Sequence, residues 1–522
     1  MFFVTETEAA ASRRTFEKEE GELSAMIEVR RLFPGIAANE KARECARSIA
    51  GGPKLPPPHP ILANRTPIMH HIFAALLLLL GGCESTSFNL PGAPDDPALY
   101  ATIYPFFIET CAVSGMKKKH GFGFEYQGGS GGHAVVYLNG VCRDTKSSHP
   151  AVQMCDEAGP SAESGVGLSA NGHFSNAAWV ATPGRDFFFD GDLRQDESVN
   201  STSYARTQAR AKQLGILNGI RFHEAVFDDL PTGMTRYDFM YEASIATDYG
   251  ISLGRGRYCA RLPVSQAQMR RVVAYLNAQN FQYRDGQRMS SMTVVGNNCS
   301  HFTHNVLASA GLWEEWPTDR FFLVSALSFP VPKNEFVNQI RRSNDLPLDN
   351  PLLLFRDEAA RQALLHDDWL PIGPGAIAIA EPIREANDLY DTDVNLIFYD
   401  IPILGSFPSY FNRITADRRY SDLAENLRHF AAVYDRLSAE RRPLEWWLNR
   451  AGLPSGDGPS FVAFYKRYYS HVDRMNDRVK LSLLTLQQTA GVPAAMPASF
   501  AAPLPSFRQA WKLGNSALES EH

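Results

Sequence analysis

The pattern of hydrophobic and polar positions predicts short buried strands and amphipathic helices in the first two thirds of the chain. Residues 131–140 read GGHAVVYLNG, an apolar run that follows glycines and ends in Asn-Gly. This pattern is typical of a buried strand. Residues 299–311 place Phe302 and Val306 at helical spacing and end at Gly311, which predicts an amphipathic helix.

The pattern changes after about residue 330. Residues 422–437 have helical apolar spacing with charges on the opposite face, and residues 461–469 form an aromatic-rich helical segment. Ahead of them, residues 373–380 and 394–399 read as strands. We therefore expect residues 330–522 to form a mostly helical accessory domain.

The composition is that of an ordinary soluble globular chain. Hydrophobic residues make up 44% and charged residues 21% of 522 positions, a length that corresponds to two or three domains. The formal net charge of -6 gives no basic footprint, so we expect no nucleic-acid partner. A single long apolar run excludes a polytopic membrane protein.

That apolar run has the length of a signal-peptide core. Residues 70–82 read HHIFAALLLLLGG, which is shorter than the roughly 20 residues of a membrane-spanning helix. The run ends at Leu80-Gly81-Gly82-Cys83 and resembles the lipobox of bacterial lipoproteins, so we expect a lipid on Cys83. The polar, Pro-rich residues 84–97 are typical of a tether. The alternative is a buried helix with a chance cysteine.

The lipobox defines further boundaries and a location. We assign 69–83 as the lipoprotein signal peptide and lipobox, with Met69 directly before the run. We then expect residues 1–68 to be an over-called N-terminal extension, that is, a segment upstream of the true start site. The alternative is a genuine extension with a short helix and a linker. The expected location is the cell envelope, lipid-anchored to a bacterial membrane and facing the periplasm, with inner and outer membrane both open.

The cysteine count predicts one free thiol. Setting aside Cys45 and Cys83 leaves five of the seven cysteines in an export compartment that permits disulfides. Cys299 is the natural odd residue. The other four can form two bridges in three possible pairings: Cys111, Cys142, Cys155 and Cys259.

Cys299 occupies the first turn of its predicted helix, with Asn297 or Asn298 as the N-cap. The positive end of a helix dipole and the free backbone N–H groups favour a thiolate. The same N–H groups can hold a developing oxyanion. The alternative for a cysteine in a helix is a small buried hydrophobic residue.

His133 is the candidate partner of that cysteine. It begins the predicted strand and shares a face with Val135 and Tyr137. An imidazole opposite Cys299 can take the thiol proton and later return it to a leaving group. We expect an imidazolium here to hold the pKa of Cys299 below its ordinary value of about 8.5. The alternative is a structural or edge histidine.

The cysteine motif resembles that of a known family. The run Asn298-Cys299-Ser300-His301-Phe302 is similar to the Asn-Cys-Glu-His-Phe motif of the lecithin:retinol acyltransferase-like family, except that Ser300 stands in place of glutamate. That family and related bacterial lipoproteins belong to the circularly permuted NlpC-type papain-like superfamily. In this branch a histidine strand precedes the cysteine helix, as His133 precedes Cys299.

The resemblance covers residues 120–315 and implies a fold. Residues 258–277 look like the strand and helix that precede the cysteine motif in such proteins. The implied class is α+β, with a permuted papain-like domain over 84–325 that combines an antiparallel sheet with the nucleophile-bearing helix. The accessory region follows it.

The implied activity is a lipid-anchored cysteine hydrolase that cleaves an amide or ester, with Cys299 as nucleophile and His133 as base. His173 is the candidate third residue that orients the histidine, with Ser169 and Asn171 nearby. The implied substrate is a cell-wall peptide or an acyl lipid. The alternatives are an acyltransferase or lipid thioesterase of the same fold, or a non-catalytic cell-envelope binding lipoprotein.

We expect neither a metal nor a cofactor. Cys299, His301 and His304 lie at i, i+2 and i+5 of one helix, which does not gather them on one face. His301 and His304 are therefore expected to face solvent or to support the site. The chain also has no glycine-rich phosphate loop between a strand and a helix.

Overall fold

The computed structural model describes residues 90, 95–128, 132–156, 164–292, 297–318, 331–371, 373–391, 396, 407–450 and 457–489. The predicted extension at 1–68, the signal segment at 69–83 and its Cys83 lie outside the described residues. The strand predicted at 394–399 also lies outside them, apart from Leu396.

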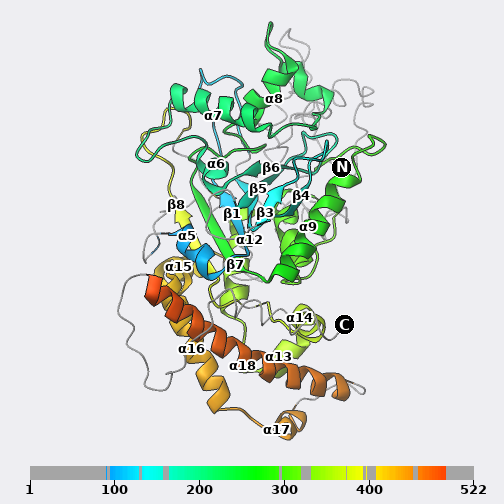
Figure 1. The fold of residues 1–522 in the computed structure, drawn as a ribbon, viewed down its shortest axis with the longest axis vertical. Helices are drawn as coiled ribbons and strands as arrows, with labels where there is room; N and C mark the ends of the chain where they lie inside the picture. The colour runs from blue at the N-terminus through cyan, green and yellow to red at the C-terminus, as the bar shows by residue number, and fades with distance from the viewer. Residues whose placement is uncertain are drawn as a thin grey trace, which may run out of the picture.

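A six-stranded sheet forms the centre of the molecule (Figure 1). Its strand order is β6-β5-β2-β1-β7-β8, and every neighbouring pair is antiparallel. A separate two-stranded ribbon pairs β3 with β4. The strands are β1 Phe107–Val113, β2 His133–Asn139, β3 Val141–Arg143, β4 Val152–Met154, β5 Gly165–Ala170, β6 Trp179–Pro183, β7 Arg257–Pro263 and β8 Ile377–Glu381.

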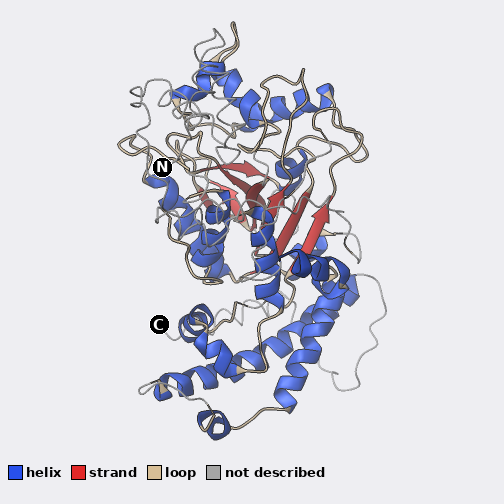
Figure 2. Ribbon diagram, turned by 180° about the vertical axis from the view of Figure 1, so that it is seen from behind, coloured by secondary structure: helices blue, strands red, loops and turns tan. Residues whose placement is uncertain are grey.

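Helices lie above, beside and below this sheet (Figure 2). Those that come before residue 320 are α5 Pro97–Ile103, α6 Arg185–Asp190, α7 Ser201–Leu214, the 3-10 helix η2 Glu224–Asp229, α8 Arg236–Ser244, α9 Gln266–Phe281 and α10 Cys299–Ser309. The later ones are α12 Pro332–Asn344, α13 Pro351–Arg356, α14 Glu358–Asp367, α15 Phe407–Ala416, the 3-10 helix η3 Arg418–Tyr420, α16 Leu423–Ala439, α17 Leu444–Leu448 and α18 Gly458–Thr489.

One face of the sheet packs against α9 and α10. Val136 and Leu138 of β2 share a buried cluster with Met269 of α9 and Val306 of α10. Because side chains alternate across a strand, the odd-numbered residues of β2, including His133, belong to the other face. The structure is therefore α+β with an antiparallel sheet, as expected.

The opposite face of the sheet joins a large apolar cluster with the C-terminal helices. Phe107 and Tyr137 of the sheet belong to the same buried cluster as Tyr434 of α16 and Tyr468 of α18. Figure 1 shows α16 and α18 crossing below the sheet. The helices predicted at 422–437 and 461–469 are confirmed as α16 and as part of the longer α18.

The sheet extends past the domain boundary predicted at 325–330. The strand predicted at 373–380 is present as β8, and it pairs along β7, with Tyr258 opposite Ala380. Helix α12 also packs on β1 and β7 through Phe336. The accessory region thus supplies an edge strand and a covering helix, because strand pairing depends on distant residues that a local pattern does not reveal.

The disulfide pairing resolves the three alternatives. Cys111 of β1 pairs with Cys259 directly opposite on β7, with their Cα atoms 4.0 Å apart. Cys142 pairs with Cys155, with Cα atoms 5.0 Å apart. Among the described cysteines, Cys299 is the one free thiol. Two bridges and a free Cys299 are what the cysteine count predicted.

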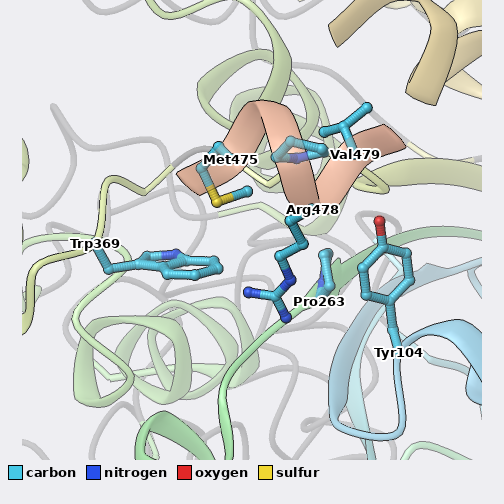
Figure 3. Close-up of a pocket in the computed structure, with 7 residues that line it drawn as sticks. Tyr104, Pro263, Trp369, Met475, Arg478 and Val479 are labelled. Atoms are coloured by element: carbon cyan, nitrogen blue, oxygen red, sulfur yellow. The ribbon is translucent and has the colours of Figure 1, made fainter. Parts of the chain in front are cut away.

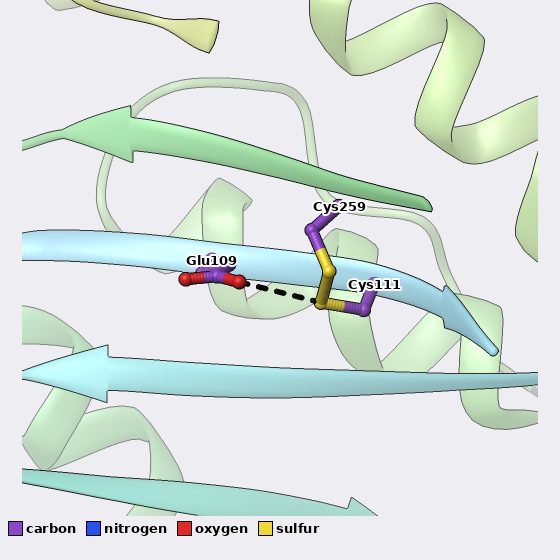
Figure 4. A group of neighbouring side chains, drawn as sticks. All are labelled: Glu109, Cys111 and Cys259. Atoms are coloured by element: carbon purple, nitrogen blue, oxygen red, sulfur yellow. Dashed lines mark hydrogen bonds between the residues drawn. A yellow bond between two sulfur atoms is a disulfide. The ribbon is translucent and has the colours of Figure 1, made fainter. Parts of the chain in front are cut away.

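A buried charge network lies on the sheet beside the first disulfide (Figure 4). Glu109 of β1 is 0% exposed and accepts hydrogen bonds from Arg185 at 2.8 and 3.0 Å and from Arg261 at 3.0 Å. Arg261 also donates to Asp95 at 2.7 and 2.8 Å. Burial raises the pKa of Glu109, but the two arginines outweigh it and lower that pKa to about 2.

The described part of the chain contains no helix with the length and apolar character needed to cross a lipid bilayer.

Candidate functional site

Helix α10 begins with a capped N-terminus that carries the free cysteine. The Asn298 side chain accepts hydrogen bonds from the N–H groups of Ser300 at 2.9 Å and His301 at 3.1 Å. The His301 ring in turn accepts the Asn298 N–H at 3.4 Å, so the cap is reciprocal. Asn298 is thus the N-cap, and Cys299 is the first residue of the helix.

The start of strand β2 fixes the position of His133. Gly132 has a φ of +77°, and a Cβ atom there would collide with the carbonyl oxygen of Val113. Only glycine adopts that conformation at this close approach without strain. His133 then pairs with Val113 and its side chain is 5% exposed. The predicted strand and its first residue are confirmed.

Hydrogen bonds define which ring nitrogen of His133 carries the proton. Nε2 lies 3.0 Å from Oγ of Ser169, and that hydroxyl donates to the main-chain carbonyl of Asp248 at 2.9 Å. A hydroxyl has one proton. Ser169 must therefore accept from Nε2–H, which leaves Nδ1 of the neutral ring unprotonated and able to act as a base.

The sulfur of Cys299 lies at the start of β2. Its Sγ accepts a hydrogen bond from the backbone N–H of Ala134, the residue that follows His133, and from the N–H groups of Cys299 and Ser300. No hydrogen bond joins the sulfur to the His133 ring among the described residues. Such contacts are often long without substrate. The structure thus places the sulfur against the main chain that follows His133, while the His133 ring lies on the other face of β2 and bonds to Ser169.

The resting pair is electrically neutral. Burial raises the pKa of Cys299 to about 11, because the N–H groups on the sulfur offset only part of that cost and the Asp248 carboxylate adds to it. Burial also lowers the pKa of His133 to about 4, although Asp248 opposes that change. The expected pKa below 8.5 for Cys299 is therefore wrong in direction, since desolvation dominates over the helix terminus.

Alkylation of Cys299 by iodoacetamide should therefore require alkaline pH. Because the thiolate forms only as the pH approaches about 11, the rate should still be rising above pH 9, as mass spectrometry of the modified peptide will show. The urea-unfolded chain is the control and should titrate near the ordinary pKa of about 8.5. Fast alkylation of the folded protein below pH 8 would instead indicate a thiolate–imidazolium pair.

The predicted third residue, His173, has other hydrogen-bond partners. Its Nδ1 lies 2.6 Å from Oδ1 of Asn171, and its Nε2 lies 3.1 Å from the hydroxyl of Tyr249. It is Ser169 instead that accepts the Nε2–H of His133, at 3.0 Å. Ser169 lies opposite Val135 in the β2–β5 pair, so its face follows from strand alternation once the register is known.

The other two histidines of α10 are buried rather than exposed to solvent. His304 is 0% exposed, lies 2.7 Å from Oε1 of Glu335 on α12, and stacks on Trp316 with ring centroids 3.8 Å apart. His301 meets Trp316 edge to face. Of the two expected positions, facing solvent or supporting the site, the first is wrong, because α10 packs between the sheet and α12 and has little free surface.

In the described residues, one group of three side chains is close enough to hold a metal ion, namely Glu109, Cys111 and Cys259. Figure 4 shows the two sulfurs joined in a disulfide beside the carboxylate. A disulfide sulfur is a poor ligand because metals bind the thiolate. Glu109 is already held by Arg185. The group therefore does not fit a cation.

A small cavity lies where α18 meets the end of β7 (Figure 3). None of its lining residues belongs to the Cys299–His133 site, and none is a thiol, a histidine or a carboxylate. They are Tyr104, Pro263, Trp369, Pro374, Met475, Arg478 and Val479. We assign no chemistry to this cavity.

Comparison with protein-family models, with curated proteins and with solved structures gives no match for this chain. A functional assignment therefore depends on the local geometry of Cys299, His133 and Ser169. That geometry consists of a free, half-buried thiol, a neutral imidazole with Nδ1 unprotonated, and a hydroxyl that accepts the other ring N–H.

Proposed function

We propose that the chain is a cysteine hydrolase that cleaves an amide or ester, with Cys299 as nucleophile and His133 as general base. The observation that carries the proposal is the position of Cys299. It is a free cysteine at the first residue of a capped helix, and its sulfur accepts the N–H of the residue after His133. A structural cysteine needs neither the cap nor a histidine held in one tautomer.

The neutral resting pair calls for proton transfer during attack. As Sγ of Cys299 forms a bond to the substrate carbonyl carbon, its proton passes to Nδ1 of His133. The C–N or C–O bond then breaks, and the leaving amine or alcohol takes that proton. Water then attacks the carbonyl carbon of the resulting thioester while Nδ1 of His133 takes a proton from it. The C–S bond breaks, the carboxylic acid product leaves, and His133 returns the proton to Sγ, which restores the free thiol.

We further propose that the sheet and α10 form a permuted papain-like domain. Two features support this proposal. The histidine strand precedes the cysteine helix in the chain, and that helix packs on an antiparallel sheet. Ser169, on the strand next to His133, then takes the role of the third residue.

We also propose that the protein is a lipoprotein of the bacterial cell envelope, anchored through Cys83. The two disulfides support an export compartment, because disulfides persist outside the reducing cytosol. When the chain is expressed from Met69, radiolabelled palmitate should be incorporated and should be lost completely in Cys83→Ala. Equal labelling of both chains would exclude Cys83 as the anchor.

The substrate class is tested with two compounds of different chemistry. The purified protein should release product from either a cell-wall muropeptide, by amide cleavage, or a diacyl phospholipid, by ester cleavage. The Cys299→Ala variant is the matched control and should release none. A hydrolase releases the phospholipid acyl chain as free fatty acid. Transfer of that acyl chain to an added alcohol or amine would instead identify an acyltransferase.

A non-catalytic binding lipoprotein is the second candidate. The observation that favours it is the resting state, in which the thiol and imidazole are both neutral and share no hydrogen bond. In that case neither substrate is cleaved, and Cys299→Ala leaves ligand binding unchanged. Acylation of Cys299 by an activated ester separates the two candidates. In a binding protein no base takes the thiol proton, so Cys299 is not acylated at neutral pH.

A further inference from the structure

The segment between α8 and β7 holds a strained loop beside the site. Ala246 and Leu253 have φ values of 58° and 41°, and both are fully buried. Non-glycine residues in this left-handed region cost free energy and persist where the surroundings impose them. The Ala246 N–H donates to the carbonyl of Ile251 at 2.9 Å, which closes the loop. The residue that this loop presents to the site is Asp248.

Asp248 contacts the site through its main chain and is held by its side chain. Its carbonyl accepts the Ser169 hydroxyl at 2.9 Å and the Asn171 amide at 3.4 Å. Its carboxylate accepts hydrogen bonds from Arg255 at 2.6 Å and from the Tyr126 hydroxyl at 3.4 Å, and the residue is 6% exposed. A buried carboxylate needs such partners to stay charged.

We propose that Asp248 is a positioning residue for His133: its carbonyl fixes the ring tautomer through Ser169, and its carboxylate stabilises the ring when it becomes positively charged. This inference rests on the proposed function, in which Nδ1 of His133 takes the thiol proton. Without the carbonyl as its acceptor, Ser169 could donate to Nε2, and the base would then carry its proton on Nδ1.

The charged and titratable groups around the His133 ring indicate how Asp248 would stabilise its protonated form. When the S–H bond of Cys299 breaks and the N–H bond forms at Nδ1, the buried ring gains a positive charge. Burial lowers the pKa of His133, Asp248 raises it, and Arg255 lowers it by a smaller amount. Further titratable groups near Asp248 are Tyr126, which is bonded to it, His173, which is bonded to Asn171, and Tyr390, whose pKa responds to the charges of Asp248 and Arg255. Asp248 thus offers the ring its compensating charge.

The test is to replace Asp248 with asparagine and to titrate the His133 ring by NMR. The ring signals of His133 are identified by their absence in the His133→Asn variant. We expect the pKa of His133 to fall below the wild-type value of about 4, and acylation of Cys299 to slow by roughly tenfold or more. Loss of the fold would move that pKa the other way, toward about 6.5. An unchanged pKa would overturn the electrostatic role.

Two further measurements test the role of Asp248 even if the Asp248→Asn variant does not fold. Asp357→Asn removes a carboxylate from another Arg–Asp pair, at 3.1 Å from Arg342, and should leave His133 unchanged. In the wild-type chain, ¹⁵N shifts should show the proton on Nε2, and a proton on Nδ1 would overturn the proposal. A failure of the proposed function is visible separately, as wild-type protein that is never acylated on Cys299.

Discussion

Replacing His133 with asparagine is expected to slow the acylation of Cys299 by about 10²–10⁴-fold, the usual contribution of a general base. The reason is the neutral thiol: with its pKa raised to about 11, almost no thiolate exists at neutral pH, so attack needs a base. The rate is measured as the burst of nitrophenol from a p-nitrophenyl ester at pH 7.

His173→Asn is the matched control for that experiment. His173 is also buried and bonded on both ring nitrogens, but to Asn171 and Tyr249. Its replacement should reduce the burst much less than His133→Asn. A loss of equal size would mean that His173 rather than Ser169 orients the base.

Replacing Glu109 with alanine is expected to destabilise the protein by about 3–5 kcal/mol, the usual cost of breaking a buried ion pair. Arg185 and Arg261, which are 8% and 0% exposed, would lose the carboxylate between them. Urea unfolding measures the change. As a control, Glu224→Ala removes a carboxylate that is 78% exposed and pairs with Arg236, and it should have no measurable effect.

The lowered pKa of Glu109 predicts that the free energy of unfolding depends on pH. The folded-state pKa of Glu109 is lowered to about 2 from an ordinary value of 4.5. Its contribution is therefore fully present above about pH 4.5 and is lost as the pH falls toward 2, with a size on the order of 3 kcal/mol. In Glu109→Gln the unfolding free energy should lose that part of its acid slope. An identical slope would mean that Glu109 is not charged in the folded state.

The parts of the site that come from local sequence were predictable. The glycine before His133, the Asn298 cap and the apolar spacing after Cys299 each act within one turn or one strand start, and β2 and α10 lie where these signals place them. The free state of Cys299 followed from an odd cysteine count. Capping and backbone strain depend on neighbouring residues, so a single sequence indicates these elements.

The remaining parts depend on residues that are distant in sequence. Ser169 reaches His133 only through the register of β2 with β5, and Asp248 arrives from a loop whose shape no local pattern specifies. The prediction of a lowered pKa for Cys299 is wrong. A helix N-terminus favours the thiolate, but burial by other elements raises the pKa by more than the helix lowers it. Burial is a property of the whole fold.

The decisive measurement is the intact mass of the protein after brief incubation with an activated ester at neutral pH, followed by mapping of the adduct. The proposed chemistry predicts one acyl group as a thioester on Cys299 in the wild type, less in His133→Asn, and none in Cys299→Ala. Wild-type protein that turns over the ester with no acyl group on Cys299, or that never becomes acylated, would contradict Cys299 as the nucleophile.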